Sequence, residues 1–306
     1  MSDATSSTSV LVEFSDGLAR AVERAGMALV RVEGRRRQGA SGVVWGDGGL
    51  ILTADHVLER DEDLQVGLPS GQTAPAQIIG RDPSTDLALL RTSAAGLTVV
   101  EQGPEPKVGH LALIVARPGS RLATSIGVVS AIGGPTRTRR GGQLDGFIRT
   151  DATFYPGFSG GPLVDTSGRM IGLATSAFGG GGAGAGLVIG LETARRVATA
   201  LAAHGRIRRG FLGLGSQPVG LPDAIKDKLG GQESGLLVVA VEPNGPAEQG
   251  GVLIGDVLVG LGGQRIRDTD DLRDQLGPER VGQATSLRVV RGGEPRELTV
   301  TIGERQ

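Results

Sequence analysis

Short apolar or alternating runs follow one another along most of this chain, separated by glycine, proline and aspartate. Runs of this kind predict β-strands joined by tight turns. The first six expected strands are Ala28–Val32, Ser41–Trp45, Leu50–Ala54, Leu64–Leu68, Ala74–Gly80 and Leu87–Arg91. The next six are Leu111–Ala116, Ala123–Ser130, Gly146–Asp151, Gly161–Val164, Met170–Ser176 and Ala185–Gly190. Two such sets predict two closed β-barrels, because closure removes exposed strand edges.

Two stretches instead have the spacing of three and four residues that is typical of an amphipathic helix. The first places Leu11, Phe14, Leu18, Val22 and Ala25 on one face, after a polar start (1–10) that we expect to be disordered. The second is Glu192–His204, whose apolar face runs from Leu191 to Leu201. A short arginine-rich segment, 205–210, follows and is expected to be a solvated linker.

A separate unit is expected from Phe211 to the C-terminus, because strands and short helices alternate there. Its expected strands are Leu236–Val241, Asp256–Gly260, Thr285–Arg291 and Glu297–Ile302. Its expected helices are one opened by Asn244-Gly245-Pro246 and one over Thr269–Leu276. The chain is therefore predicted to be mainly β, with a double barrel followed by a smaller domain.

Composition narrows the classes of function. Among 306 residues there are 53 glycines and 3% aromatics, which suits a β-rich protein with many turns. The net charge of −1 gives no electrostatic case for a nucleic-acid partner. Without cysteine the chain has neither disulfides nor thiol chemistry, and no histidine spacing typical of a metal site is present, so no metal or cofactor is expected.

The N-terminus predicts a compartment only conditionally. It has no basic and apolar leader pattern, and no apolar run in the chain is long enough to span a bilayer. If Met1 is the natural start, we expect a cytoplasmic protein. If a leader has been removed, the protein is periplasmic or otherwise extracytoplasmic.

The candidate chemistry centres on Ser159 in Gly157-Phe158-Ser159-Gly160-Gly161. A serine becomes a nucleophile when a base takes its proton and backbone N–H groups stabilise the oxyanion that forms. His56 ends an apolar strand and is the candidate base. Asp86 directly precedes another strand and is the candidate acid that orients the imidazole. The order histidine, aspartate, serine is that of chymotrypsin-like proteases.

These three blocks resemble the triad blocks of the HtrA (Deg) family, which are trypsin-like serine proteases with a C-terminal PDZ domain. The blocks are Leu52-Thr53-Ala54-Asp55-His56-Val57, Ser84-Thr85-Asp86-Leu87-Ala88-Leu89 and Phe158-Ser159-Gly160-Gly161-Pro162-Leu163. The resemblance runs from about Leu11 to the C-terminus. It implies a chymotrypsin-like double β-barrel over 11–204, a linker over 205–210 and a PDZ domain over 211–306. Two departures stand out: Phe158 replaces the family's usual asparagine, and Ala54-Asp55 stands where the family has Asn-Asn or a similar pair.

The resemblance also implies roles for further residues. The N–H groups of Gly157 and Ser159 would form the oxyanion hole. Thr153, Thr175 and Ala177 would line a specificity pocket for a small or medium apolar side chain, beside a loop at Gly179–Gly186. The segment Phe211-Leu212-Gly213-Leu214 would bind the C-terminal carboxylate of a peptide. A homotrimer is implied through the N-terminal segment.

Three functions fit the sequence to different degrees. The first is an ATP-independent endopeptidase that cuts unfolded or damaged proteins and recognises peptide C-termini. The second is a PDZ chaperone or scaffold with a closed or inactive protease domain. Phe158 and the glycine run at Gly179–Gly186 motivate it, because Phe158 would either anchor its loop or favour a flipped, inactive one. The third, an esterase of the α/β-hydrolase type, lacks the required alternation of strands and helices.

Overall fold

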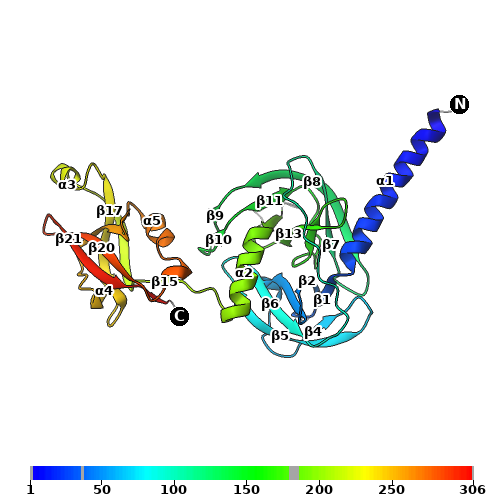
Figure 1. Cartoon of the computed structure of the whole chain (residues 1–306), viewed down its shortest axis with the longest axis horizontal. Coiled ribbons are helices and arrows are strands. Elements are labelled where there is room, and N and C mark those ends of the chain that lie inside the picture. Colours follow the sequence, from blue (N-terminus) through cyan, green and yellow to red (C-terminus); the bar gives the residue numbers. More distant parts are fainter. Residues whose placement is uncertain (1–2, 36–37, 179–185, 305–306) are drawn as a thin grey trace. The chain divides into compact units, whose positions relative to one another are not determined.

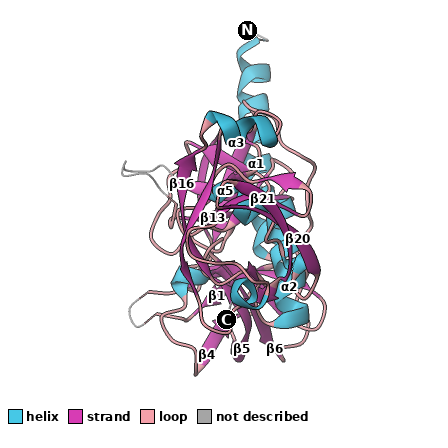
Figure 2. Ribbon diagram, turned by 90° about the vertical axis from the view of Figure 1, so that its left-hand side faces the viewer, coloured by secondary structure: helices cyan, strands magenta, loops and turns pink. Residues whose placement is uncertain are grey.

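The computed structural model describes residues 3–35, 38–178 and 186–304. The chain divides into two compact units, Met1–Ile207 and Arg208–Gln306. Strands dominate both of them (Figure 1; Figure 2). The expected loop at Gly179–Gly186 falls, except for its last residue, outside the described residues.

The first barrel is closed by six strands in the order β1-β2-β3-β6-β5-β4. Their bounds are β1 Leu29–Val32, β2 Ala40–Gly46, β3 Leu50–Ala54, β4 Leu64–Gly67, β5 Thr73–Asp82 and β6 Leu87–Thr92. A 3₁₀ turn, η1 Asp55–Val57, follows β3 directly. The barrel interior is filled by fully buried aliphatic side chains such as Val30, Ile51 and Leu90.

The second barrel is also closed by six strands, in the order β11-β14-β13-β12-β7-β8. Their bounds are β7 Leu111–Ala116, β8 Ala123–Gly133, β11 Phe147–Thr150, β12 Pro162–Val164, β13 Met170–Thr175 and β14 Leu187–Gly190. A small ribbon, β9 Thr136–Arg137 with β10 Gln143–Leu144, lies between β8 and β11 in the chain. The prediction of a double β-barrel is confirmed.

Helix α2, Leu191–His204, holds the two barrels together. Its buried residues Val197 and Leu201 belong to one apolar cluster that also contains Leu52 and Leu89 of the first barrel and Leu173 of the second. Gly205 ends the helix in the left-handed conformation, and its N–H donates to the carbonyl of Leu201. The core thus continues from one barrel into the other, which fixes the strand ends at which the site is built.

Helix α1 spans Asp3–Gly26 and so begins well before Leu11. Our expectation of disorder over 1–10 is therefore wrong from Asp3 onward: a helix that packing has nucleated downstream extends at little further cost through polar residues. Its C-terminal part packs on the second barrel through Leu18, Val22 and Ala25. In both views its N-terminal part extends away from the barrels (Figure 1; Figure 2).

The segment expected as a linker is ordered up to the boundary between the units. Ile207 packs on the cluster shared by the two barrels. On the other side of the boundary, Arg208 forms an ion pair with Glu304. The strand pair β15 Gly210–Phe211 and β22 Gly303–Glu304 then joins the two ends of the C-terminal unit.

The C-terminal unit is a twisted sheet with short helices. Its main strands run in the order β16-β17-β18-β20-β21, with β19 paired to β18. Their bounds are β16 Leu214–Gly220, β17 Ser234–Val241, β18 Val257–Leu261, β19 Gln264–Arg265, β20 Ala284–Arg291 and β21 Glu294–Thr301. The helices are α3 Asp223–Lys228, α4 Pro246–Gln249, α5 Thr269–Asp274 and the 3₁₀ turn η2 Pro278–Arg280. Strand β16 ends the sheet order, so one of its edges is left for another strand.

Candidate active site

Strand register brings His56 and Asp86 together. Strands β3 and β6 pair with Ala54 opposite Leu87, so the residues just beyond these two face one another. The ladder continues for one step, because the N–H of Asp55 donates to the carbonyl of Asp86 at 3.1 Å. Asp86 has a φ of +57°, in the left-handed region that aspartate tolerates better than most residues. This turn aims its carboxylate at the imidazole.

The carboxylate of Asp86 is buried and receives three donors. His56 Nδ1 lies 2.8 Å from Oδ2 and 3.0 Å from Oδ1, and the backbone N–H of His56 donates to Oδ1 at 2.9 Å. The third donor is the hydroxyl of Thr175, at the end of β13 in the other barrel. With its side chain only 1% exposed, this carboxylate is held by hydrogen bonds rather than by water.

Antiparallel pairing of β12 and β13 places Ser159 beside Ser176. The N–H of Gly160 donates to the carbonyl of Ala174 at 2.9 Å, and the N–H of Ala174 donates to Gly161 at 2.9 Å. Ser159 Oγ then lies 3.1 Å from Ser176 Oγ, which is in turn 3.3 Å from His56 Nε2. Within the described residues the candidate nucleophile Ser159 is connected to the imidazole through Ser176, a residue that no sequence motif indicated.

Ser41 of β2 attaches the Ser159 loop to the first barrel. Its buried hydroxyl donates to the carbonyl of Gly157 at 2.9 Å and accepts the N–H of Arg117 at 2.9 Å. Its own N–H donates to the carbonyl of Ser159 at 3.2 Å. In the sequence Ser41 is only a strand position, and its role becomes visible only where the two barrels meet.

The loop needs glycine on both sides of Phe158-Ser159. Gly157 has a φ of +86°, and a Cβ there would lie 2.5 Å from Pro118 Cβ. Gly160 has a φ of +85°, and a Cβ there would lie 2.0 Å from the carbonyl oxygen of Ser41. Between them Phe158 is 2% exposed and packs in the apolar cluster of the second barrel, with its ring 5.4 Å from that of Tyr155. The side chain that departs from the family pattern therefore anchors the loop.

The other departure, Asp55, is neutralised locally. Its carboxylate is buried and accepts Nε–H of Arg81 at 2.6 Å, while Arg81 also pairs with Asp61 at 2.6 Å. Burial lowers the pKa of Arg81, but hydrogen bonds and charge from the two aspartates outweigh it and hold that pKa above its ordinary value. The guanidinium therefore stays charged and balances the carboxylate next to His56.

The residues expected to line the specificity pocket fall in different surroundings. Thr153 and Ala177 are exposed, whereas Thr175 is buried and its hydroxyl faces Asp86. The N–H of Ala177 donates to Thr175 Oγ1 at 3.0 Å. The side chain of Thr175 is thus committed to the Asp86 carboxylate, and the pocket stays a prediction.

Segment Phe211-Leu212-Gly213-Leu214 connects two strands, since Phe211 ends β15 and Leu214 begins β16. The carbonyls of Leu212 and Gly213 accept the N–H groups of Ala247 and Glu242, at 2.7 and 2.8 Å. Gly213 has a φ of +72°. Among the described residues no acceptor is found for the N–H groups of Leu212 and Gly213. Helix α5 contacts β16, so the free edge of that strand has a helix beside it.

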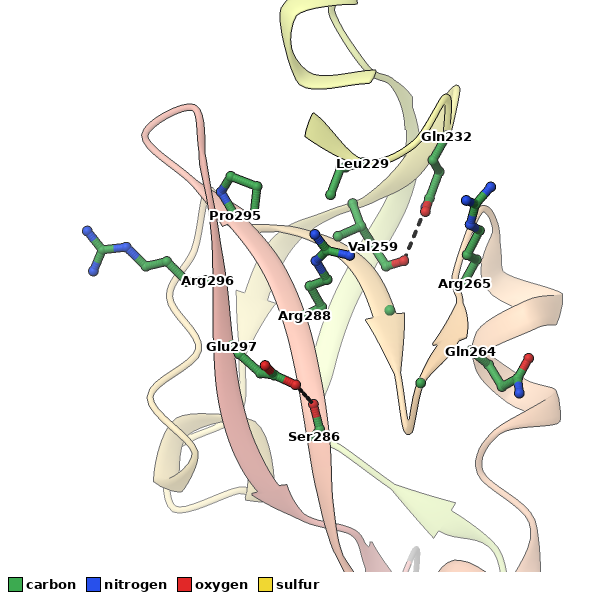
Figure 3. Close-up of a pocket in the computed structure, with 12 residues that line it drawn as sticks. Leu229, Gln232, Val259, Gln264, Arg265, Ser286, Arg288, Pro295, Arg296 and Glu297 are labelled. Carbon is green, nitrogen blue, oxygen red and sulfur yellow. Dashed lines mark hydrogen bonds between the residues drawn. The ribbon is translucent and has the colours of Figure 1, made fainter. Parts of the chain in front are cut away.

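The C-terminal unit also contains a pocket of about 420 Å³, which the sequence did not indicate. Figure 3 shows Arg265, Arg288 and Arg296 around it, and the amide of Gln232 donating to the carbonyl of Val259. None of the four residues from Phe211 to Leu214 lines it. In the described part of the chain no cluster of acidic and histidine side chains could hold a metal ion, and no helix is long and apolar enough to cross a membrane.

Two family models match this chain in the order of its two units: a trypsin-like peptidase domain over residues 40–173 and a PDZ domain over residues 211–302. A solved HtrA-type protease, AlgW with a decapeptide, is 30% identical, with a TM-score of 0.76 that covers 94% of this chain and 99% of that one. The chain belongs to the HtrA family. The serine endoprotease from Yersinia pestis is a second solved relative of this HtrA chain, with a TM-score of 0.77, 30% identity and coverage of 94% and 98%.

Curated relatives of this HtrA chain are longer. A probable periplasmic DegP-like serine endoprotease of Ectopseudomonas mendocina is 35% identical over 278 residues, which are 88% of this chain and 58% of that protein. One from Chlamydia trachomatis is 33% identical over 267 residues, 86% of this chain and 53% of that protein. The chain thus spans little more than half the length of these relatives.

The prediction of a cytoplasmic location is wrong. The relatives just described are named as periplasmic proteins. The prediction rested on the N-terminal sequence alone, whereas a secretory leader is absent from any mature protein and leaves no trace in the fold or its site. A polar N-terminal sequence therefore does not identify the compartment.

Proposed function

We propose that this HtrA chain is an ATP-independent serine endopeptidase that cuts unfolded or damaged proteins. His56 is the general base and then the general acid, Asp86 fixes the imidazole, and Ser159 forms the acyl-enzyme. The observation that carries the proposal is the Asp86 carboxylate, buried and bonded to His56 Nδ1 at 2.8 Å, with Ser159 on the facing barrel. This bond leaves Nε2 of the neutral ring as a proton acceptor on the side of the nucleophile.

Backbone N–H groups of Gly157 and Ser159 form the oxyanion hole in this proposal. Neither has an acceptor among the described residues, whereas the N–H of Phe158 between them donates to Tyr155 at 3.1 Å. The carbonyl of Gly157 is turned toward Ser41. Because a peptide unit points its N–H and its carbonyl in opposite directions, holding this carbonyl fixes the unit that carries the Phe158 N–H, between the two proposed donors. One donor of this kind is worth about 3 kcal/mol of transition-state stabilisation.

The specificity pocket in this proposal lies at Thr153, Thr175 and Ala177, and accepts small or medium apolar side chains. No carboxylate was found at these positions that would favour lysine or arginine. A peptide library cleaved by the protein, with the cut sites identified by mass spectrometry, tests this preference. Cleavage mainly after basic residues would contradict it.

Peptide C-termini bind the PDZ domain at Phe211–Leu214 in this proposal. Two N–H groups there are without acceptors among the described residues, and the free edge of β16 can pair with an extended peptide. The solved AlgW relative carries a decapeptide. Fluorescence anisotropy of a labelled apolar peptide, with a free or an amidated C-terminus, tests the role of the carboxylate: equal affinity for both would contradict it.

A homotrimer, built through α1, and an extracytoplasmic location complete the proposal. The N-terminal half of α1 exposes Val10, Leu11 and Phe14 by 62%, 66% and 48%, an apolar face without a partner in the described chain. Sedimentation equilibrium of the full chain beside a Leu11→Ser, Phe14→Ser variant tests the assembly. A wild type that sediments as a monomer would contradict it.

Unfolded casein incubated with wild type and with Ser159→Ala tests the endopeptidase itself. Cleavage by the wild type alone is expected. If casein survives both at all temperatures and with added C-terminal peptides, the second function, a peptide-binding chaperone or scaffold, replaces the first. The chaperone or scaffold function was suggested by a flipped, inactive loop at Phe158. The buried Phe158 side chain anchors this loop instead and so does not favour that function.

A further inference from the structure

Ser176 forms hydrogen bonds with both the proposed base and the proposed nucleophile. Its hydroxyl oxygen is 3.3 Å from His56 Nε2 and 3.1 Å from Ser159 Oγ, and its backbone N–H also reaches Ser159 Oγ at 3.3 Å. It directly follows Thr175, whose hydroxyl bonds to Asp86. Two consecutive residues of one strand end therefore contact all three residues of the proposed triad.

Asp86, His56, Ser176 and Ser159 form a series of hydrogen bonds. The direction of each bond follows from the Asp86 carboxylate, which accepts the first one. An ionised carboxylate only accepts, so the proton of the neutral imidazole sits on Nδ1, which faces Asp86. Nε2 then has only a lone pair, and the Ser176 hydroxyl must donate to it. With its one proton used, Ser176 Oγ accepts from Ser159, so the two serine O–H groups point in series toward the base.

We propose that Ser176 is a catalytic residue that relays the proton from Ser159 to His56. This inference rests on the proposed serine endopeptidase. As Ser159 Oγ forms its bond to the substrate carbonyl carbon, its O–H bond breaks and the proton passes to Ser176 Oγ. In the same step the Ser176 proton passes to His56 Nε2. The carbonyl π electrons move to the oxyanion, and the imidazolium is held by Asp86.

When the amine leaves, the proton moves from His56 to the amine nitrogen and not back to Ser159. The imidazolium passes it through the Ser176 hydroxyl or directly, and Ser176 ends each turnover unchanged. Concerted movement is required, because a serine hydroxyl on its own is too weak a base to hold the extra proton. The N–H of Ser176, which donates to Ser159 Oγ at 3.3 Å, helps to hold the two hydroxyls in line.

Ser176→Ala tests the relay and leaves the three residues of the proposed triad unchanged. Ser176 is exposed, so the variant is expected to fold with an unchanged midpoint of thermal unfolding. The acylation rate should fall by about 100-fold, the lower end of the range for general acid–base catalysis, with a small change in KM. Ser176→Thr keeps a hydroxyl and should restore much of the rate. Ser130→Ala, another exposed serine of the same barrel, is the matched control.

The number of protons that move in the transition state of acylation distinguishes a relay from a structural role of Ser176. In mixtures of H₂O and D₂O, the acylation rate of the wild type should curve with deuterium fraction, as two protons require, and that of Ser176→Ala should be linear. Rates equal to the Ser130→Ala control, with linear plots for both proteins, would overturn the relay and leave the endopeptidase intact.

Labelling of Ser159 by a fluorophosphonate keeps the two proposals distinguishable. If the wild type labels but cleaves no protein, the endopeptidase proposal fails, and the labelling rates of wild type and Ser176→Ala still decide the relay. If the wild type does not label at all, the relay fails together with the proposed function.

Discussion

Removal of the Ser41 hydroxyl is expected to damage catalysis from the opposite barrel. Ser41 is fully buried and its hydroxyl bonds to two backbone groups, the carbonyl of Gly157 and the N–H of Arg117, each at 2.9 Å. In Ser41→Ala both groups lose their partner in a site that water cannot readily enter. Each such orphaned group costs about 1–3 kcal/mol, so we expect a clear loss of stability.

The catalytic effect has its own upper limit. The Gly157 N–H belongs to the preceding peptide unit, so it leaves the proposed oxyanion hole only if the whole loop shifts once the Gly157 carbonyl is released. Loss of one such donor lowers kcat by about 10²–10³-fold, so the expected decrease lies between about tenfold and this limit. The KM for a short peptide should change little, because the donor matters mainly in the transition state.

The assay is steady-state cleavage of a chromogenic peptide, beside thermal unfolding followed by the circular dichroism of the barrels. Thr92→Val is a matched control, because it also removes a buried hydroxyl that bonds to a backbone carbonyl, in this case that of Pro75. Both variants should lose stability, but only Ser41→Ala should lose kcat. Equal kcat in the two variants would refute the reasoning and reduce Ser41 to a structural contact.

Three further outcomes are expected. Ser159→Ala and His56→Ala should each abolish peptide cleavage, and the double variant should be little worse, because the two groups act as a unit; additive losses would argue against a shared mechanism. Gly160→Ala should unfold far below wild type by calorimetry, since its Cβ would lie 2.0 Å from the Ser41 carbonyl oxygen, and a shift of only a degree or two would contradict this. In the PDZ domain burial raises the pKa of Asp256, but hydrogen bonds and charge, chiefly from Arg291, outweigh it and hold that pKa below its usual value. The stabilisation is therefore complete above the unfolded value of about 3.9 and is lost as pH falls through the folded value. Asp256→Asn should thus be less stable than wild type at pH 7, with the gap closing in acid, and a gap that is constant with pH would contradict the assignment.

Local pattern was sufficient for the barrels and most of their strands, because alternation and turn residues are properties of a few consecutive positions. It was also sufficient for the three triad candidates, since each sits in a short block of distinctive residues. It failed for α1 from Asp3 to Ser9, where polar composition suggested disorder and a helix continues instead. It also gave no sign of β16, whose Gly215 and Pro218 weaken the strand pattern, although pairing with β17 makes it a strand.

The sequence by itself determined that this chain is a double β-barrel with a PDZ domain, and which histidine, aspartate and serine are its triad candidates. Only the tertiary structure decided how they are connected. Thr175 and Ser176 come from the second barrel and reach Asp86 and His56 of the first, while Ser41 reaches back to Gly157. These contacts join residues far apart in the chain, through hydroxyls common in any strand. They exist because the shared core fixes two barrels against each other, and no local pattern encodes that placement.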